Sequence, residues 1–146
     1  MRKRTQAREC ALKILYQIDV TALNLDMIFD HFWEDAEDTY AHEVREFSTR
    51  LVYGVHENCE AIDQKIMVYA TNWQLKRMAV IDRNILRLGV FELFYSEDIP
   101  PKVTINEAVE MAKKYGDLES SKFVNGILDK MHKTEIVGQK EKEDDP

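Results

Sequence analysis

The chain has 146 residues, of which 45% are hydrophobic and 32% are charged, and this composition predicts one ordinary globular domain. A chain of this length buries roughly 70% of its unfolded surface, so it needs no disulfide framework, and two cysteines are too few for one. No apolar run is long enough to cross a membrane or to act as a secretory leader, so we expect a cytoplasmic protein with no membrane partner. The net charge of −7 argues against non-specific coating of nucleic acid, although a local basic patch can still bind RNA.

The scarcity of helix breakers predicts an all-α fold. The chain has five glycines and three prolines, and residues 1–99 contain no proline. Apolar residues spaced three and four apart predict a first helix at about 5–19. Asn24 is placed to cap a second helix, and a third, long helix is expected over about 40–69 with a bend at Gly54.

The second half of the chain predicts a buried central helix. Residues 71–74 fit a capping box, and residues 78–96 are apolar on most faces, which is typical of a helix surrounded by others. After Pro100 and Pro101, a second capping box at 104–107 predicts a helix that ends near Gly116. A last helix is expected at about 119–133. We therefore predict a single domain over 1–134, with subdomains at about 1–70 and 71–134, and a polar, disordered tail at 135–146.

Sequence motifs of catalysis are missing. The chain has no glycine-rich phosphate loop, no HExxH, no CxxC and no GxSxG. His56 and Cys59 lie one helical turn apart, but two ligands do not make a zinc site. We expect a protein that is not an enzyme and that holds no metal or cofactor.

Charge is distributed unevenly along the chain. Residues 1–13 hold five cations against Glu9, whereas residues 19–46 hold nine carboxylates against Arg45. The basic segment predicts an RNA contact, because cations closely spaced on one helix can follow a run of phosphates.

Five segments, in the same order along the chain, resemble the NusB family of bacterial transcription antitermination factors. They are residues 7–16 (ARECALKILY), 51–55 (LVYGV), 82–87 (DRNILR), 103–113 (VTINEAVEMAK) and 122–129 (KFVNGILD). The resemblance implies about seven helices in two packed helical subdomains and a non-catalytic adaptor. Such an adaptor pairs with the small-subunit ribosomal protein that doubles as NusE. The pair binds boxA-type single-stranded RNA of nascent ribosomal transcripts and joins the RNA polymerase antitermination complex.

Residues of the chain can be assigned to these two partners. We predict that the RNA-binding residues are Arg2, Lys3, Arg4, Arg8, Lys122, Phe123 and Asn125, with the Phe123 ring stacked on an unpaired base. The resemblance places the NusE-like partner around Tyr16, Asp82 and Arg83. With Glu92, these are the predicted partner-binding residues, on an acidic chain that complements a basic ribosomal protein.

Several alternatives stay open at this stage. The N-terminal cations also fit a solubilising helix start, Phe123 also fits the core, and Asn125 also fits a hydrogen bond that ties the last two helices together. The whole chain also fits a protein-interaction bundle without direct RNA contact. The sequence leaves open whether the free protein forms a homodimer.

Overall fold

A computed structural model describes residues 2–36, 38–70 and 75–138, and most residues in these ranges are helical. The helices are α1 (Lys3–Thr21), α2 (Leu25–Asp35), α3 (His42–Glu57), α4 (Cys59–Tyr69), α5 (Val80–Tyr95), α6 (Pro101–Tyr115) and α7 (Ser120–Met131). A short 3₁₀ turn, η1 (Leu75–Arg77), precedes α5, and a wider helical turn, η2 (His132–Val137), follows α7. The described ranges contain no strand, and the all-α prediction is confirmed.

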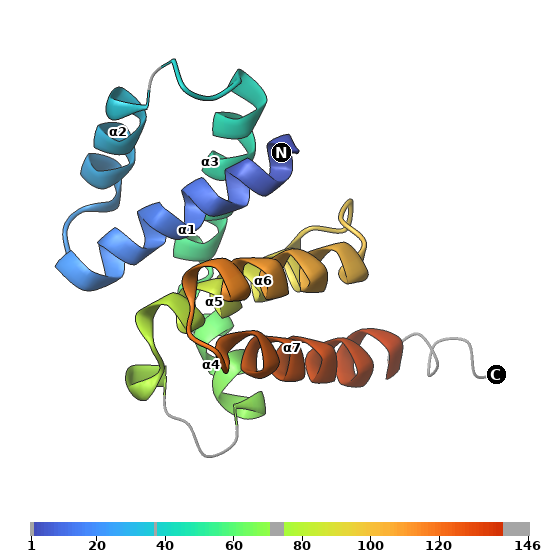
Figure 1. The fold of residues 1–146 in the computed structure, drawn as a ribbon. Coiled ribbons are helices and arrows are strands. Elements are labelled where there is room, and N and C mark those ends of the chain that lie inside the picture. Colours follow the sequence, from blue (N-terminus) through green and yellow to red (C-terminus); the bar gives the residue numbers. More distant parts are fainter. Residues whose placement is uncertain (1, 37, 71–74, 139–146) are drawn as a thin grey trace.

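Helix α5 lies at the centre of the molecule, as its all-round apolar pattern predicted. It contacts α1, α3, α4, α6 and α7 (Figure 1). Ile85, Leu86, Leu88 and Val90 on this helix are completely buried. Because these side chains point in different directions around one helix, packing on every side is the arrangement that removes all of them from water.

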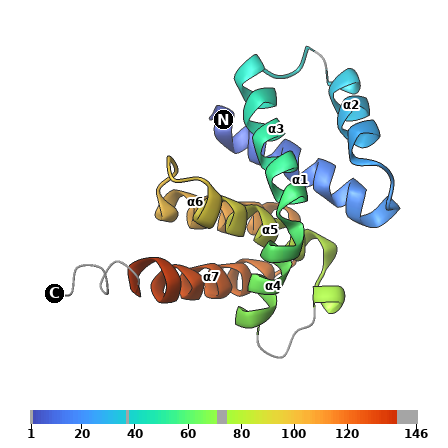
Figure 2. The same ribbon diagram turned by 180° about the vertical axis from the view of Figure 1, so that it is seen from behind.

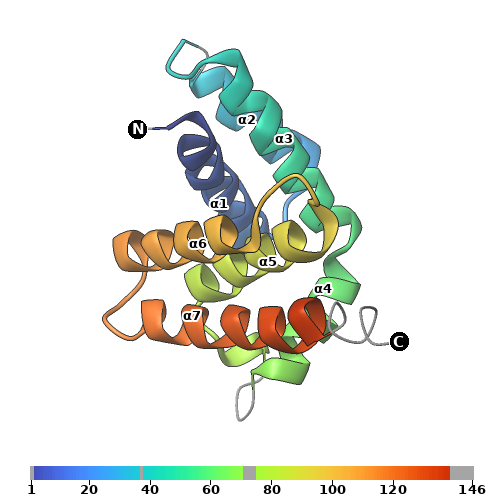
Figure 3. The same cartoon turned by 90° about the vertical axis from the view of Figure 1, so that its right-hand side faces the viewer.

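Helices α1, α2 and α3 form one group, and α4, α6 and α7 lie on the other side of α5 (Figures 1 and 2). Helix α4 packs mainly against α5 and α7, so it belongs with the C-terminal helices by its contacts. A subdomain boundary at about residue 70 would separate α4 from the helices on which it packs. Figure 3 shows α6 and α7 side by side beneath α1 and α3. The buried apolar side chains of both groups form one continuous core.

Two glycines let helices approach closely. A Cβ atom on Gly54 of α3 would lie 2.2 Å from the ring of Phe91 on α5, and a Cβ atom on Gly89 of α5 would lie 2.7 Å from Leu128 on α7. Neither distance is sterically possible without movement, so a side chain at either position would force the facing ring or leucine side chain, or the helix that carries it, to shift.

The predicted helix at 40–69 is two helices, and the expected bend at Gly54 is wrong. The chain breaks at Asn58, between α3 and α4. The Asn58 amide Nδ2 donates to the carbonyl of Gly54 at 2.8 Å. An asparagine side chain that binds a nearby carbonyl competes with the helix ladder, and this favours a break. By contrast, Asn24 caps α2 as predicted, because its Oδ1 accepts from the Met27 amide at 3.3 Å.

The capping box expected at 104–107 is also wrong. Helix α6 begins at Pro101, a residue type well suited to the first helical position. The Thr104 hydroxyl is buried and donates to Glu92 on α5 at 3.0 Å. The other predicted capping box, at 71–74, lies outside the described residues.

The predicted start of the polar tail, at residue 135, lies inside a helical segment. The helical chain continues through η2 to Val137, and Glu135 of η2 pairs with Lys65 of α4 at 2.5 Å. Residues 139–146 of the predicted tail lie outside the described ranges. Within those ranges, no helix combines the length and the apolar character that crossing a bilayer requires.

Candidate nucleic-acid and partner interface

The N-terminal arm, Arg2 to Arg4, is exposed at the start of α1. Lys3 Nζ pairs with Glu43 of α3 at 2.5 Å, and Arg4 Nη2 lies 3.5 Å from Asp98 in the loop between α5 and α6. Both pairs are open to solvent, and ion pairs this exposed are weak. A phosphate can therefore exchange with either carboxylate.

The ring of Phe47 on α3 gathers three guanidinium groups. The centre of this ring lies 4.4 Å from Arg4, 5.4 Å from Arg8 and 5.6 Å from Arg50. Arg50 also donates two hydrogen bonds to Asp98, and these bonds lower the pKa of that carboxyl to about 2. The start of α1 is thus held on α3 by cation–π contacts, which leaves the outer face of the arm accessible.

Arg8 does not belong to an RNA surface in this structure, and its assignment is corrected. Its side chain is only 2% exposed. Arg8 Nε and Nη2 donate to the two carboxylate oxygens of Glu92 at 2.9 and 2.7 Å, and Nη1 lies 3.4 Å from Glu107. A guanidinium that is bound in this two-pronged way and closed to solvent cannot meet a phosphate.

Glu92 is corrected for the same reason, since it was predicted to bind the protein partner. Its side chain is 2% exposed and accepts from Arg8 of α1 and Thr104 of α6. These bonds join α1, α5 and α6 inside the core. The arrangement fits the general rule that a buried charge is paired and hydrogen-bonded.

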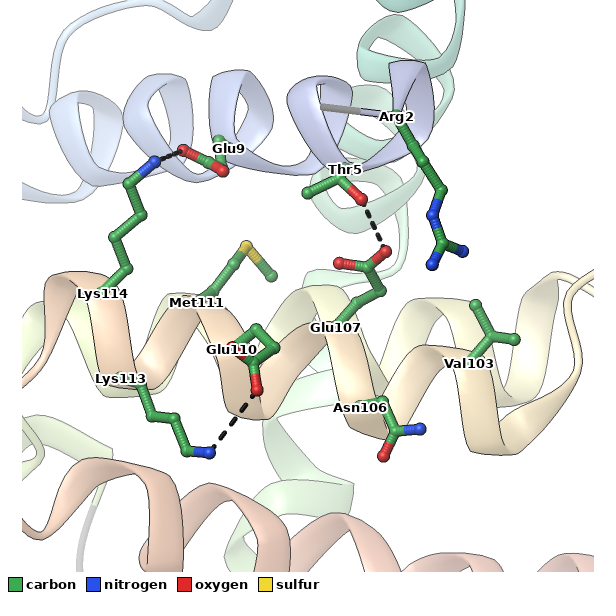
Figure 4. A pocket seen from close by; sticks show the side chains of 10 residues that line it. All are labelled: Arg2, Thr5, Glu9, Val103, Asn106, Glu107, Glu110, Met111, Lys113 and Lys114. Atoms are coloured by element: carbon green, nitrogen blue, oxygen red, sulfur yellow. Dashed lines mark hydrogen bonds and ion pairs between the residues drawn. The ribbon is translucent and has the colours of Figure 1, made fainter.

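A groove with a volume of about 570 Å³ runs between α1 and α6. Figure 4 shows Arg2 extending from α1 toward α6 at one end of the groove, and Lys114 reaching back to Glu9 at the other end. Lys114 Nζ lies 2.7 Å from Glu9, which also accepts from the Tyr115 hydroxyl. Burial alone would raise the pKa of Glu9, but these two bonds lower it below its usual value.

Helix α7 presents the second predicted RNA segment. Lys122 and Asn125 are exposed, whereas Phe123 is half-buried and packs partly against the core. The exposure of Asn125 does not fit a hydrogen bond between the last two helices. The start of α7 lies at the opposite end of α6 from the N-terminal arm (Figure 1), so the structure does not bring the two predicted RNA segments together.

The predicted partner residues Tyr16 and Arg83 lie where α1 meets α5. Tyr16 is 39% exposed, and Asp19, one turn further along α1, accepts hydrogen bonds from Arg83 at 2.6 and 2.7 Å. Arg87 Nη1 also donates to Asp19 at 3.0 Å. Burial would raise the pKa of Asp19, but Arg83, Asn84 and Arg87 lower it overall. Arg83 thus holds two helices together, and Tyr16 is the more accessible of the two residues.

Asp82, also assigned to the partner, lines a pocket of about 270 Å³ at the starts of α5 and α7. Phe123, assigned to RNA, lines the same pocket. The two predicted surfaces therefore meet at this point instead of lying apart. Burial raises the pKa of Asp82, and the neighbouring Asp117 raises it further.

The sequence did not indicate several other residues that line this groove and this pocket. Lys113 and Lys114 line the groove, and Arg77, Met78, Asp117 and Ser120 line the pocket. One available signal was the pair Asp117 and Ser120, three residues apart before an apolar run, which is typical of a helix start. The Asp117 carboxylate accepts from the amides of Glu119 and Ser120 at 2.9 and 3.1 Å.

In the part of the chain that the structure describes, no group of three His, Cys, Asp or Glu side chains is placed to hold an ion. The NusB family model matches residues 5–133 of the chain. A relative from Anaeromyxobacter dehalogenans, the transcription antitermination protein NusB, is 50% identical over 129 residues, which are 88% of this chain and 89% of that relative.

The chain belongs to the NusB family. This membership confirms the resemblance read from the five segments. The family consists of non-catalytic transcription antitermination factors, so the prediction that the chain is not an enzyme is also confirmed.

Solved structures of NusB proteins share the fold. The chain superposes on T. maritima NusB with a TM-score of 0.82 at 40% identity, covering 91% of this chain and 92% of that one. It superposes with a TM-score of 0.83 at 31% identity on a chain from a crystal structure of antitermination factors NusB and NusE in complex with double-stranded RNA. That match covers 92% of this chain and 98% of the other.

Proposed function

We propose that this NusB-family chain is an RNA-binding adaptor that acts in the cytoplasm with the NusE ribosomal protein on boxA-type RNA. In this role it joins the RNA polymerase antitermination complex on nascent ribosomal transcripts. The observation that carries the proposal is the exposed N-terminal arm, which holds Arg2, Lys3 and Arg4 in an acidic protein. Because the rest of the chain is acidic, phosphate binding is directed to a few places.

Two further observations support the proposal. A structural relative of this chain occurs in a complex of NusB and NusE with RNA. Tyr16, at the junction of α1 and α5, is an exposed aromatic residue of the kind enriched in protein interfaces. A basic ribosomal protein would also be attracted to an acidic chain.

A titration of fluorescently labelled boxA-type RNA tests the proposal. Anisotropy is measured with this chain alone, with NusE from the same organism alone, and with both proteins together. We expect measurable binding by the chain alone and tighter binding by the mixture, because each protein contributes contacts to one RNA. A scrambled RNA of equal length serves as the control and should bind more weakly to the mixture.

A protein-interaction bundle without direct RNA contact is the second candidate function. It is favoured by the pairing of Lys3 and Arg4 with Glu43 and Asp98, which partly neutralises the arm. In this case the chain would bind NusE but would not bind RNA alone, and it would not tighten RNA binding by NusE. That result would overturn the adaptor proposal.

A further inference from the structure

Two exposed arginines share one carboxylate beside the N-terminal arm. Arg50 of α3 donates to Asp98 from Nη1 and Nη2 at 3.1 and 2.5 Å, and Arg4 Nη2 lies 3.5 Å from the same carboxylate. About half of the Arg4 and Asp98 side chains and 36% of the Arg50 side chain are exposed. The three side chains together carry a net charge of +1, and all of them are open to a ligand from solvent.

The ring of Phe47 orients both guanidinium groups. Its centre lies 4.4 Å from Arg4 and 5.6 Å from Arg50, and the Phe47 residue is only 6% exposed. The third guanidinium at this ring, that of Arg8, is already bound to Glu92. A guanidinium held over an aromatic ring loses little freedom when it binds an anion. Two such groups that converge on one carboxylate can also converge on one phosphate.

Asp98 occupies the position that a phosphate would take. It lies in the turn between α5 and α6, where the Ile99 amide donates to the Ser96 carbonyl at 3.1 Å. Ile99 is buried and Pro100 follows it, so this turn is anchored in the core and keeps Asp98 close to Arg50. The hydrogen bonds from Arg50 lower the pKa of Asp98 to about 2. The two arginines therefore face an ionised carboxylate at every physiological pH.

We propose that Arg4 and Arg50 form a binding site for one phosphodiester of the RNA, and that Asp98 is the internal competitor for this site. The inference rests on the proposed function. It adds Arg50 of α3 to the RNA contact of the arm, and it names a residue that limits the strength of that contact. A phosphodiester carries the same charge as the carboxylate and offers two free oxygens to the guanidinium groups. When it binds, the Asp98 side chain turns outward into water, which costs little because that carboxylate is already half-exposed.

The exchange of Asp98 for a phosphate is close to balanced. Opening an exposed ion pair of this kind changes an equilibrium constant by at most about fivefold. A phosphate that must displace Asp98 therefore binds up to about fivefold more weakly than it would without the carboxylate. Because the contact involves no base, Asp98 should lower the affinity for different RNAs about equally.

A carboxylate of a protein partner is the competing occupant, because it has the same charge and also presents two oxygens. The neighbouring cations favour RNA. Arg2 and Lys3 precede Arg4 on the same arm, and a row of cations suits the repeating phosphates of a single strand better than one carboxylate.

Asp98→Asn tests the competitor, because it removes the negative charge and keeps the size of the side chain. Anisotropy titration of labelled boxA-type RNA at about 0.1 M salt should show binding about threefold to fivefold tighter than that of the wild type. Asp30→Asn is the control, since it removes the same charge at an exposed site on α2, with α1 and α3 between it and the α5–α6 loop (Figures 1 and 2). The control should change the affinity less than about twofold, because salt screens a distant charge. If Asp98 served only to position the arginines, Asp98→Asn would weaken RNA binding. Weaker or unchanged binding would overturn the proposal.

Arg50→Gln tests the phosphate contact in the same titration. It should weaken RNA binding about threefold or more, since it removes a charge-assisted hydrogen bond. Arg45→Gln removes an exposed arginine of the same helix and should change the affinity less than about twofold. All variants should keep the wild-type circular dichroism spectrum. Wild-type RNA affinity in Arg50→Gln would overturn the site while leaving the adaptor proposal intact. A changed affinity for NusE with an unchanged affinity for RNA would assign the site to the protein partner and would also overturn the proposal.

Inorganic phosphate probes the site without RNA, so this measurement stays informative if the chain alone does not bind RNA. Phosphate is titrated into the ¹⁵N-labelled chain, with chloride at equal ionic strength as the control. We expect phosphate, but not chloride, to shift the Arg50 Nε–H signal and the Asp98 amide signal. Asp98→Asn should need about threefold to fivefold less phosphate for half of the shift, and Arg50→Gln should abolish the shift of the Asp98 amide. The absence of a phosphate-specific shift in both the wild type and Asp98→Asn would overturn the proposal.

Discussion

Helix α5 carries two buried carboxylates that differ in whether all their oxygens have hydrogen-bond partners. Glu92 receives hydrogen bonds from Arg8 and Thr104, and all three side chains lie inside the core. Asp82 lies ten residues earlier, about 15 Å along the helix, and keeps one buried oxygen without a partner. Both are acidic residues on the same apolar helix, so their chemical type does not explain the difference.

The difference lies in what surrounds each end of α5. At Glu92, α1 and α6 close over the carboxylate and bring their own donors. At Asp82, α7 begins with Ser120 and leaves an open pocket. A carboxylate whose hydrogen bonds are all satisfied internally holds helices together, whereas a buried one that lacks a donor lowers the stability of the fold.

Arg8→Met should produce the largest effect, because it leaves Glu92 buried without its ionic partner. We expect the free energy of unfolding to fall by about 3–5 kcal/mol, measured by urea denaturation. Replacing Glu92 by leucine in the same chain should recover part of the loss, because the fully buried carboxylate is then removed together with its partner. A loss below about 1 kcal/mol for Arg8→Met would show that the pair does not hold the helices together.

Leu86→Ala probes the apolar part of α5 between the two carboxylates. Leu86 is completely buried, and truncation of such a side chain leaves a cavity that its neighbours cannot fill. We expect a loss of about 2–5 kcal/mol in the free energy of unfolding, again by urea denaturation. Val103→Ala, at a partly exposed apolar position on α6, is the control and should cost much less. Equal losses at the two sites would contradict the central position of α5.

Asp82→Asn should stabilise the fold, in contrast to changes at Glu92. Burial and Asp117 raise the pKa of Asp82 above its value in the unfolded chain. A carboxyl group with a raised pKa stabilises the fold only while it is protonated, and this contribution is lost as the pH rises through the folded-state pKa. We therefore expect a gain of about 1 kcal/mol at pH 7, measured by urea denaturation.

The gain should disappear below about pH 4, where the unfolded carboxyl is also protonated. Glu92→Gln is the matched change on the same helix, and it should lower stability because it weakens the bonds from Arg8. A loss of stability in Asp82→Asn at pH 7 would show that Asp82 is satisfied within the fold.

The N-terminal arm should give the smallest effect, and only on RNA binding. With Arg8 buried, about three or four cations remain from Arg2, Lys3, Arg4 and Lys122. The slope of log K against log salt should be about −2 to −3, at ~0.7 per phosphate for single strands. Arg4→Ala should make the slope shallower by about 0.7 and weaken different RNAs about equally. An unchanged slope would remove Arg4 from the RNA contact.

Local patterns in the sequence identified the helices well. The capping of α2 by Asn24 and the central position of α5 follow from short-range chemistry, namely a side chain that binds a nearby amide and an apolar pattern around one helix. The break at Asn58 was missed because the apolar spacing of three and four continues across it. The spacing of apolar residues predicts which of them are buried, but it does not predict whether one helix continues between them.

The candidate sites depended more on tertiary structure. The sequence determined which residues are charged, that α1 begins with cations, and that the chain belongs with antitermination factors by its five segments. Whether a charge faces water was decided only when helices distant in sequence packed together. Arg8 meets Glu92 across 84 residues of chain, and Asp82 meets Phe123 at one pocket. A charged side chain on a partly buried helix is stable either in a buried pair or at the surface, and the position of the partner helix selects between them.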